Sequence, residues 1–371
     1  AVGLCKFRNT EGEFRRFRVG ENLNSERPSN EIVKRITEAV AALPADRPAD
    51  SALVDKLLPD GMSTSEVLRR EAKLLDQRAQ RMRELAVAVH ARRTQQELAD
   101  EVAKKPEDFD LLRAALLLSR IDNEEVDVEV YLREVDQLVT DIKVEIPNDA
   151  SEQDRLATLD RFLFEQLGFH GSRTNYYHRS NSYLNEVIDD REGLPITLSV
   201  LYMELARRLD LKVVGVGLPG HFVVRYEPEE GESKLIDVFE KAELITTETA
   251  RTMIRVRLNG QVDKEEAEQL IDTFLEASPP KAILLRMLSN LRGVAEEDRD
   301  LDSILRYLDT ALVIDPDSLE NRARRIDIRI RSGRIPEALV DIDWMLEKRP
   351  EGMDVNQVLQ LRADLEVRLL Q

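Results

Sequence analysis

The sequence predicts an α+β protein in which a buried helix packs against a small antiparallel sheet, with helices before this core and helical repeats after it. Three observations support this prediction. Apolar residues recur at helical spacing over 63–169, short valine-rich runs follow from residue 212, and the C-terminal part repeats every 34 residues. We therefore expect four parts: an N-terminal extension and linker (1–62), a helical region (63–169), the α+β core (170–278) and the repeats (279–371).

The bulk composition limits the possible functions. The 371 residues carry a formal net charge of -18, which opposes binding to nucleic acid or anionic lipid. The sequence has one cysteine, Cys5, and four histidines that form no metal-binding motif. We therefore expect no disulfide, no metal site and no cofactor. No apolar run approaches the ~20 residues of a membrane span, and nothing resembles a signal peptide. A cytoplasmic protein without membrane contact is expected, and its oligomeric state is left open.

The N-terminal extension shows little periodicity. Residues 1–19 hold two runs rich in Phe and Arg around "NTEG", which indicate a hairpin or a tail. Four prolines interrupt 20–62, so we expect a linker with one short helix at 30–42.

A long helix is predicted to begin near residue 63. Its apolar residues recur at alternating steps of four and three, a period of 3.5 that is typical of a helix packed lengthwise against a partner. The pattern lasts only about three heptads, so packing within the chain is favoured over coiled-coil dimerisation. The seam comprises Leu68, Ala72, Leu75, Ala79, Met82, Ala86 and Val89. Further helices are expected at 109–121, 126–142 and 154–169.

The core combines a helix with short strands. Apolar side chains cover most of the circumference of the helix at 194–209, so other elements must enclose it. "KVVGVGL", "HFVVRY" and "KLIDVF" then predict an antiparallel sheet of three strands or more, and a helix at 264–276 follows.

The C-terminal part contains an internal repeat of 34 residues, the tetratricopeptide period. We expect helices at about 281–295, 300–314, 319–332 and 335–348, followed by a terminal capping helix. The matched positions are Leu301, Leu305, Leu308, Leu312 and Pro316, and then Ile335, Leu339, Ile342, Leu346 and Pro350.

The start of the core helix suggests a catalytic layout. A helix N-terminus activates a cysteine and stabilises an oxyanion, a histidine on a neighbouring strand can act as base, and a carboxylate can orient it. His221 opens one strand and Asp237 ends the next, so the two can lie side by side. The helix itself begins with Gly193-Leu194-Pro195, and no cysteine is near.

These residues resemble a known family. "NSYLNEVIDDREGLPITLSVLYMELARRLDLKVVGVGLPGHFVVRY" and "LIDVF" are similar to bacterial proteins that join a transglutaminase-like core to C-terminal tetratricopeptide repeats. The resemblance is strong over about 155–245 and covers 63–371 in outline. It implies a transglutaminase/papain-like core.

The resemblance also implies roles for single residues. In catalytic members of the superfamily, Gly-x-Cys opens the core helix, and the histidine and aspartate follow on adjacent strands. Gly193, His221 and Asp237 match the glycine, histidine and aspartate, whereas Pro195 occupies the nucleophile position. Gly-Ile/Leu-Pro is the usual pattern of this subfamily, so the resemblance supports the fold and argues against the superfamily's chemistry.

Other residues are weaker candidates. Thr197 or Ser199 could offer a hydroxyl nucleophile, although a bond to a backbone carbonyl one turn back is favoured. Cys5 could enter the site only if the N-terminal segment folded across it. Cleft-lining candidates are Gly193, Thr197, Asn181 and Tyr183; the last two belong to the polar loop "SRTNYYHRSNSYLN", for which turn and cap bonding is the favoured role.

Two classes of function follow. The favoured hypothesis is a non-catalytic interaction protein whose repeats, residues 281–371, bind a protein or peptide, with basic or amphipathic segments as first candidates. The alternative is a hydrolase or acyltransferase that uses the His221-Asp237 pair without a cysteine. The pair could also serve structure alone, by fixing the two strands. A regulatory fold that senses a small metabolite is a third, weaker option.

Overall fold

The computed structural model describes residues 6–8, 14–16, 34, 38, 55, 62–174, 176–258 and 264–370. The chain divides into two units, residues 1–86 and 87–371, and the boundary falls within helix α3 (Met62–Val102).

The first unit holds two short strands and most of helix α3. Strands β1 (Lys6–Arg8) and β2 (Phe14–Arg16) pair antiparallel, with Lys6 opposite Arg16, as a hairpin around "NTEG" requires. Residues 34 and 38 are helical, and the rest of the helix expected at 30–42 lies outside the described residues. In the described part of α3, most side chains between residues 68 and 90 are exposed, so the apolar seam has no partner there.

The second unit begins with helices that enclose the core. Asp110 and Asp127 each cap a helix by accepting hydrogen bonds from backbone N–H groups of its first turn. Helix α6 (Glu152–Asp160) continues directly as a π-helix, η2 (Arg161–Gln166). The helices are α4 (Leu111–Arg120), α5 (Val128–Glu145), α6 (Glu152–Asp160) and, after a 3₁₀ turn η3 (Arg179–Ser182), α7 (Leu184–Asp190).

The core is the buried helix α8 (Pro195–Arg208) against a small antiparallel sheet, as predicted. The first twelve residues of α8 are buried, and Pro195 takes the first helical position, where its missing N–H costs no bond. The sheet has the order β5-β6-β7-β8, with strands β5 (Val213–Val216), β6 (Val223–Tyr226), β7 (Lys234–Asp237) and β8 (Glu243–Ile245).

The sheet separates two apolar clusters. Val224 and Tyr226 of β6 face the main core with α8, whereas Val223 faces a smaller cluster formed with helices α9 (Thr247–Leu258) and α10 (Lys264–Phe274). This alternation follows the two-residue period of a strand, and it places α9 and α10 on the face of the sheet opposite α8. A further short parallel pair joins β3 (His170–Gly171) to β4 (Glu192–Gly193) just before α8.

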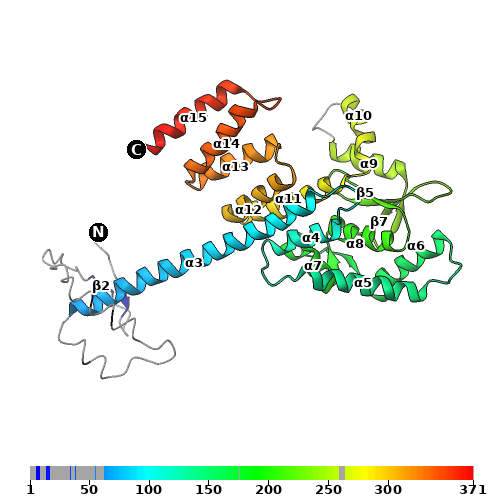
Figure 1. Ribbon diagram of the computed structural model, residues 1–371, viewed down its shortest axis with the longest axis horizontal. Helices are drawn as coiled ribbons and strands as arrows, with labels where there is room; N and C mark the ends of the chain where they lie inside the picture. Colours follow the sequence, from blue (N-terminus) through cyan, green and yellow to red (C-terminus); the bar gives the residue numbers. More distant parts are fainter. Residues whose placement is uncertain are drawn as a thin grey trace. The chain divides into compact units, whose positions relative to one another are not determined.

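Five helices complete the chain, and consecutive ones pack against each other, as the yellow-to-red ribbon of Figure 1 shows. Gly333 has φ +74° at the turn between the third and fourth, a backbone conformation that glycine adopts without strain. The helices are α11 (Pro280–Glu297), α12 (Leu301–Ile314), α13 (Leu319–Arg331), α14 (Ile335–Lys348) and α15 (Val355–Leu369). Within the described residues, no helix combines the length and the apolar character that crossing a bilayer requires.

Candidate functional site

A tight turn before strand β6 positions His221. Gly220 in this turn has φ +76°, and the backbone N–H of His221 donates to the carbonyl of Leu218 at 3.1 Å. The Arg286 guanidinium reaches the turn from α11 and donates through Nη2 to the carbonyls of Leu218 (2.7 Å) and His221. Burial lowers the pKa of Arg286, and no carboxylate of the described residues forms an ion pair with it. The side chain therefore works as a hydrogen-bond clamp on the turn.

His221 and Asp237 form a hydrogen-bonded pair across neighbouring strands. His221 Nε2 lies 2.7 Å from Asp237 Oδ2, and the other carboxylate oxygen accepts from the amides of Phe239 (3.1 Å) and Glu240 (3.3 Å). The Asp237 side chain is 5% exposed and that of His221 19%. With Nε2–H donating to the carboxylate, Nδ1 of the neutral imidazole is the acceptor. Among the described residues, no group hydrogen bonds to Nδ1.

Aromatic packing fixes the plane of the imidazole. The ring of Phe239 meets that of His221 edge to face, with centroids 6.2 Å apart, and Tyr176 contacts the Phe239 ring in turn. Gly171 makes this packing possible, because a Cβ there would lie 2.4 Å from the Phe239 ring. The histidine is thus held by a carboxylate on one side and an aromatic edge on another.

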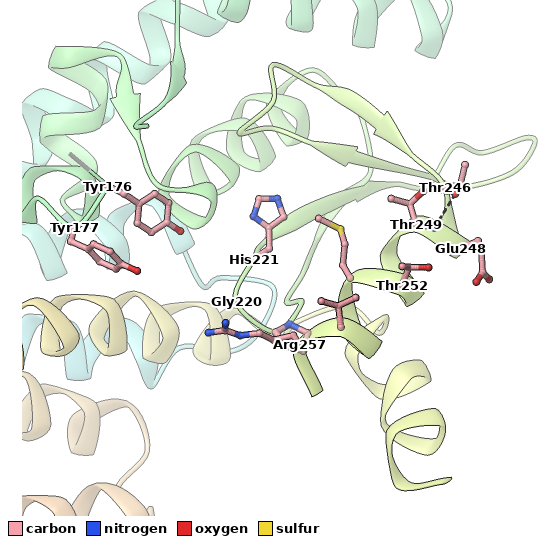
Figure 2. Close-up of a pocket in the computed structure, with 12 residues that line it drawn as sticks. Tyr176, Tyr177, Gly220, His221, Thr246, Glu248, Thr249, Thr252 and Arg257 are labelled. Carbon is pink, nitrogen blue, oxygen red and sulfur yellow. Dashed lines mark hydrogen bonds between the residues drawn. The ribbon is translucent and has the colours of Figure 1, made fainter. Parts of the chain in front are cut away.

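His221 borders an open cavity of about 1070 Å³. Figure 2 shows the His221 ring between Tyr176 and Tyr177 on one side and the residues of α9 on the other. The α9 wall is amphipathic, with Met253 and Val256 beside threonines and Arg257. The cavity can therefore accommodate a ligand with both apolar and hydrogen-bonding groups.

The start of α8 is a packed structural junction. Thr197 Oγ1 accepts from the N–H of Leu194 (3.0 Å) and donates to the carbonyl of Asn181 (2.8 Å). A Cβ on Gly193 would lie 2.8 Å from Val187, so the backbone here permits only glycine. Gly193, Asn181 and Thr197 are buried, and none of them lines the cavity beside His221.

Tyr183 lies in a different network. Its hydroxyl donates to Asp122 at 2.7 Å and is 3.4 Å from the Tyr307 hydroxyl, and burial raises its pKa. The four cleft-lining candidates therefore pack the helix start and a helix junction, and they do not line the cavity.

Ser199 and Cys5 are the remaining candidates for a nucleophile. Ser199 is fully buried, and its Oγ has no hydrogen-bond partner in the described part of the chain. Cys5 lies outside the described residues. Searching those residues finds no group of three or more His, Cys, Asp or Glu side chains that could hold a metal.

Sequence reasoning missed half of the cavity. Tyr176 and Tyr177 belong to the polar loop "SRTNYYHRSNSYLN", for which the sequence predicts Asn181 and Tyr183 as cleft-lining residues instead. The α9 residues carry no motif, because "TETARTMIRVRL" is an ordinary amphipathic helix. The exposure of Met253 and Val256, which marks this wall of the cavity, is a property of the fold that the sequence does not show.

Fold and site together define a transglutaminase-like core, and a family model of the transglutaminase-like superfamily matches residues 129–289, from α5 into α11. A UPF0162 protein of Xylella fastidiosa is 31% identical over 265 residues, which cover 71% of this chain and 93% of the relative. The chain therefore belongs to the UPF0162 family.

More distant relatives share the core. Protein SirB1 of Salmonella typhimurium is 27% identical over 59% of this chain and 78% of its own length. The human F-box only protein 21 is 28% identical over 44% of this chain and 26% of its own length. No solved structure matches the chain.

Proposed function

We propose that this chain is a non-catalytic or regulatory interaction protein, in which α11 to α15 act as tetratricopeptide-type repeats that bind a protein segment. The observation that carries the proposal is the buried Pro195 at the helix start where catalytic superfamily members hold a cysteine. Neither nearby hydroxyl replaces it, because Thr197 is engaged in the helix cap and Ser199 is buried inside the core.

The binding surface that we propose is a cavity of about 420 Å³ between α11, α12 and α13. Arg286, Ser289 and Arg292 line it from successive turns of α11, and Asn321 lines it from α13. Arg292 donates through Nη2 to Ser289 Oγ (3.2 Å) and pairs through Nε with Glu296 (3.4 Å), which leaves further N–H groups of its guanidinium for a ligand. These N–H groups suit the carbonyl and carboxylate oxygens of an extended peptide.

A pull-down and a peptide array, both with the full chain, test this proposal. Arg292→Glu should abolish binding of any partner that uses the cavity, because it replaces a donor by a repelling carboxylate. Arg299→Glu is the matched control: it makes the same charge change in the α11–α12 turn, outside the cavity. If Arg292→Glu leaves every bound partner in place, or no partner is found, the proposal fails.

A second candidate function is hydrolysis or acyl transfer by His221 and Asp237 without a cysteine. It is supported by the position of His221 on the wall of an open cavity, with Nδ1 available to take a proton. Nδ1 would accept a proton from an attacking water while Asp237 holds the tautomer. An amide or ester carbonyl is the substrate class that such a base serves.

The test is an activity screen on peptide, amide and ester substrates. His221→Ala should abolish any activity found, and His170→Ala, an exposed histidine on β3, should not change it. Activity that survives His221→Ala would rule the pair out as the site.

A further inference from the structure

An apolar seam lies exposed on helix α3. Leu75 is 48% exposed, Met82 66% and Val89 60%, although large apolar side chains in a water-soluble helix are ordinarily covered. One heptad apart, they occupy the d positions of a coiled-coil repeat. Alanines at 72, 79 and 86 occupy the a positions between them. Along the seam, small alanines therefore alternate strictly with large apolar residues.

The seam runs along one continuous helix. Residues 71–92 span roughly 33 Å, about three heptads, which is enough for a pairwise helix contact. Within the described residues, the charged side chains that flank the seam, Glu71, Asp76, Arg83 and Arg92, form no ion pair. Both the apolar seam and the charges beside it are therefore available to a partner.

A parallel pairing of two copies is disfavoured by charge. In a parallel dimer each g position faces the e position five residues later on the other helix. Glu71 would face Asp76, and Arg78 would face Arg83, each twice by symmetry. Alanine would also meet alanine in every second layer, which leaves voids beside the layers of large residues.

An antiparallel pairing satisfies both packing and charge. When residue 80 of one copy lies opposite residue 81 of the other, e faces e and g faces g, so Asp76 meets Arg83 and Glu71 meets Arg92 of the other copy. Every layer then sets one alanine against one large residue. The three distinct layers are Ala72 with Val89, Ala79 with Met82, and Ala86 with Leu75.

Neighbouring registers fit less well. A shift by one heptad in one direction sets Asp76 against Asp76 and Arg78 against Arg78 of the other copy. The shift in the other direction sets Arg83 against Arg83 and Arg78 against Arg92. A shift by two heptads toward the N-terminus restores opposite charges but leaves Val89 without a layer. One register alone uses the whole exposed seam with opposite charges on both sides.

We propose that α3 is a homodimerisation element, in which two copies of this chain pair antiparallel through Ala72, Leu75, Ala79, Met82, Ala86 and Val89. The occupant of the seam is a second copy, because only this orientation and register combines opposite flanking charges with a layer for every exposed apolar residue of the seam.

Sedimentation velocity of the full chain between about 1 and 100 µM tests the proposal, since a micromolar interface fills in this range. The wild type should dimerise. Asp76→Arg and Arg83→Asp should each raise the dimer Kd about tenfold, because each turns two attractions into repulsions. The double variant Asp76→Arg/Arg83→Asp should restore the wild-type Kd, because residues 76 and 83 again carry opposite charges. If the single variants were weak dimers only because they misfold, combining them would not restore the Kd.

Arg81→Asp is the control, since it makes the same charge change at a c position away from the seam and should leave the Kd unchanged. A wild type that stays monomeric throughout overturns the proposal, as would single variants that leave the Kd unchanged. Tighter dimers of both single variants would also overturn it, because only the parallel orientation gains attractions from each change.

Discussion

Asp160 is a largely buried carboxylate that forms no ion pair within the described residues. It is the last residue of α6, and its Oδ1 accepts from the Tyr202 hydroxyl of α8 at 2.7 Å. Burial raises the pKa of Asp160 from 3.8 to about 6 and raises that of Tyr202 as well. Because the folded state holds this proton more tightly, the stability that the group contributes is complete below pH 3.8 and is lost as the pH rises through 6.

Asp160→Asn should therefore make the protein more stable at neutral pH. Asparagine keeps an acceptor for Tyr202 and carries no charge to desolvate, so the free energy of unfolding at pH 8 should rise by up to roughly 3 kcal/mol, the equivalent of about two pKa units. The measurement is urea unfolding, followed by circular dichroism, of both proteins at several pH values. The difference between them should vanish near pH 4; a difference that does not depend on pH would contradict the assignment.

The positions of single residues were predictable from the sequence where the pairing of adjacent strands fixes them. Adjacent strands bring His221 to Asp237, as expected, although their function stays a prediction. The packing of Tyr183 and Asn181 could not be foreseen, because it depends on which remote side chains come near. A polar residue in a loop gives no sign in the sequence of whether it will face a cavity or the interior.

Among the elements, α13 and α14 are joined through one buried charge. The Asp341 carboxylate of α14 is fully buried and accepts from three arginines of α13, at positions 322, 325 and 329. Arg322 also lies over the Trp344 ring, 3.7 Å from its centroid. Asp341 neutralises this basic helix face together with Asp309 of α12, which pairs with Arg325 at 2.6 Å. Loss of Asp341 would leave Arg322 without a carboxylate partner among the described residues, and Arg329 with only a longer contact to Asp309.

Asp341→Ala should cost about 3–5 kcal/mol of unfolding free energy, because it strands those cations in a low-dielectric site. Asp343→Ala serves as the comparison. Asp343 lies on the exposed face of α14 and forms an ion pair with Arg362 of α15, so its loss should lower the free energy of unfolding by less than about 1 kcal/mol. Thermal and urea unfolding of both variants measure the effect. Equal losses in the two variants would mean that the buried network does not stabilise α14.

Elements with strong periodicity were predictable, and those with mixed patterns were not. The helices expected at 300–314 and 335–348 match α12 and α14, since their leucines and isoleucines recur at steps of three and four. Strand β8 and helix α9 were missed, because both are short and largely exposed. The π-helical turn after Asp160 also carries no sequence signature, since it depends on the packing of its neighbours.

Within the second unit, Asp122 links three segments that are far apart in the sequence. It follows α4 and accepts from Tyr183 before α7 at 2.7 Å, and from Arg306 and Tyr307 of α12 at 2.6 and 2.5 Å. Burial raises the pKa of Tyr183 and Tyr307, so both hydroxyls stay protonated as donors. This carboxylate therefore ties the helical region and the core to the C-terminal helices.

Asp122→Ala should lower the free energy of unfolding by about 3–5 kcal/mol, because it leaves the Arg306 charge and two buried hydroxyls without their acceptor. Limited proteolysis should then cut before α11 earlier than in the wild type, since the C-terminal helices lose an anchor. Asp317→Ala, an exposed aspartate in the turn after α12, should leave both measurements unchanged. Resistance to protease equal to that of the wild type would contradict this role.

Arg286 belongs to two sites at once. The residue lines the cavity among α11, α12 and α13, and its guanidinium clamps the turn that carries His221. If the proposed segment binds in the first cavity and draws the guanidinium away from the turn, it would release the turn that carries His221 and so change the affinity of the second cavity for a ligand. By thermodynamic reciprocity, a ligand beside His221 would then change the affinity for that segment by the same factor. Through this one side chain, the two proposed binding sites would be coupled.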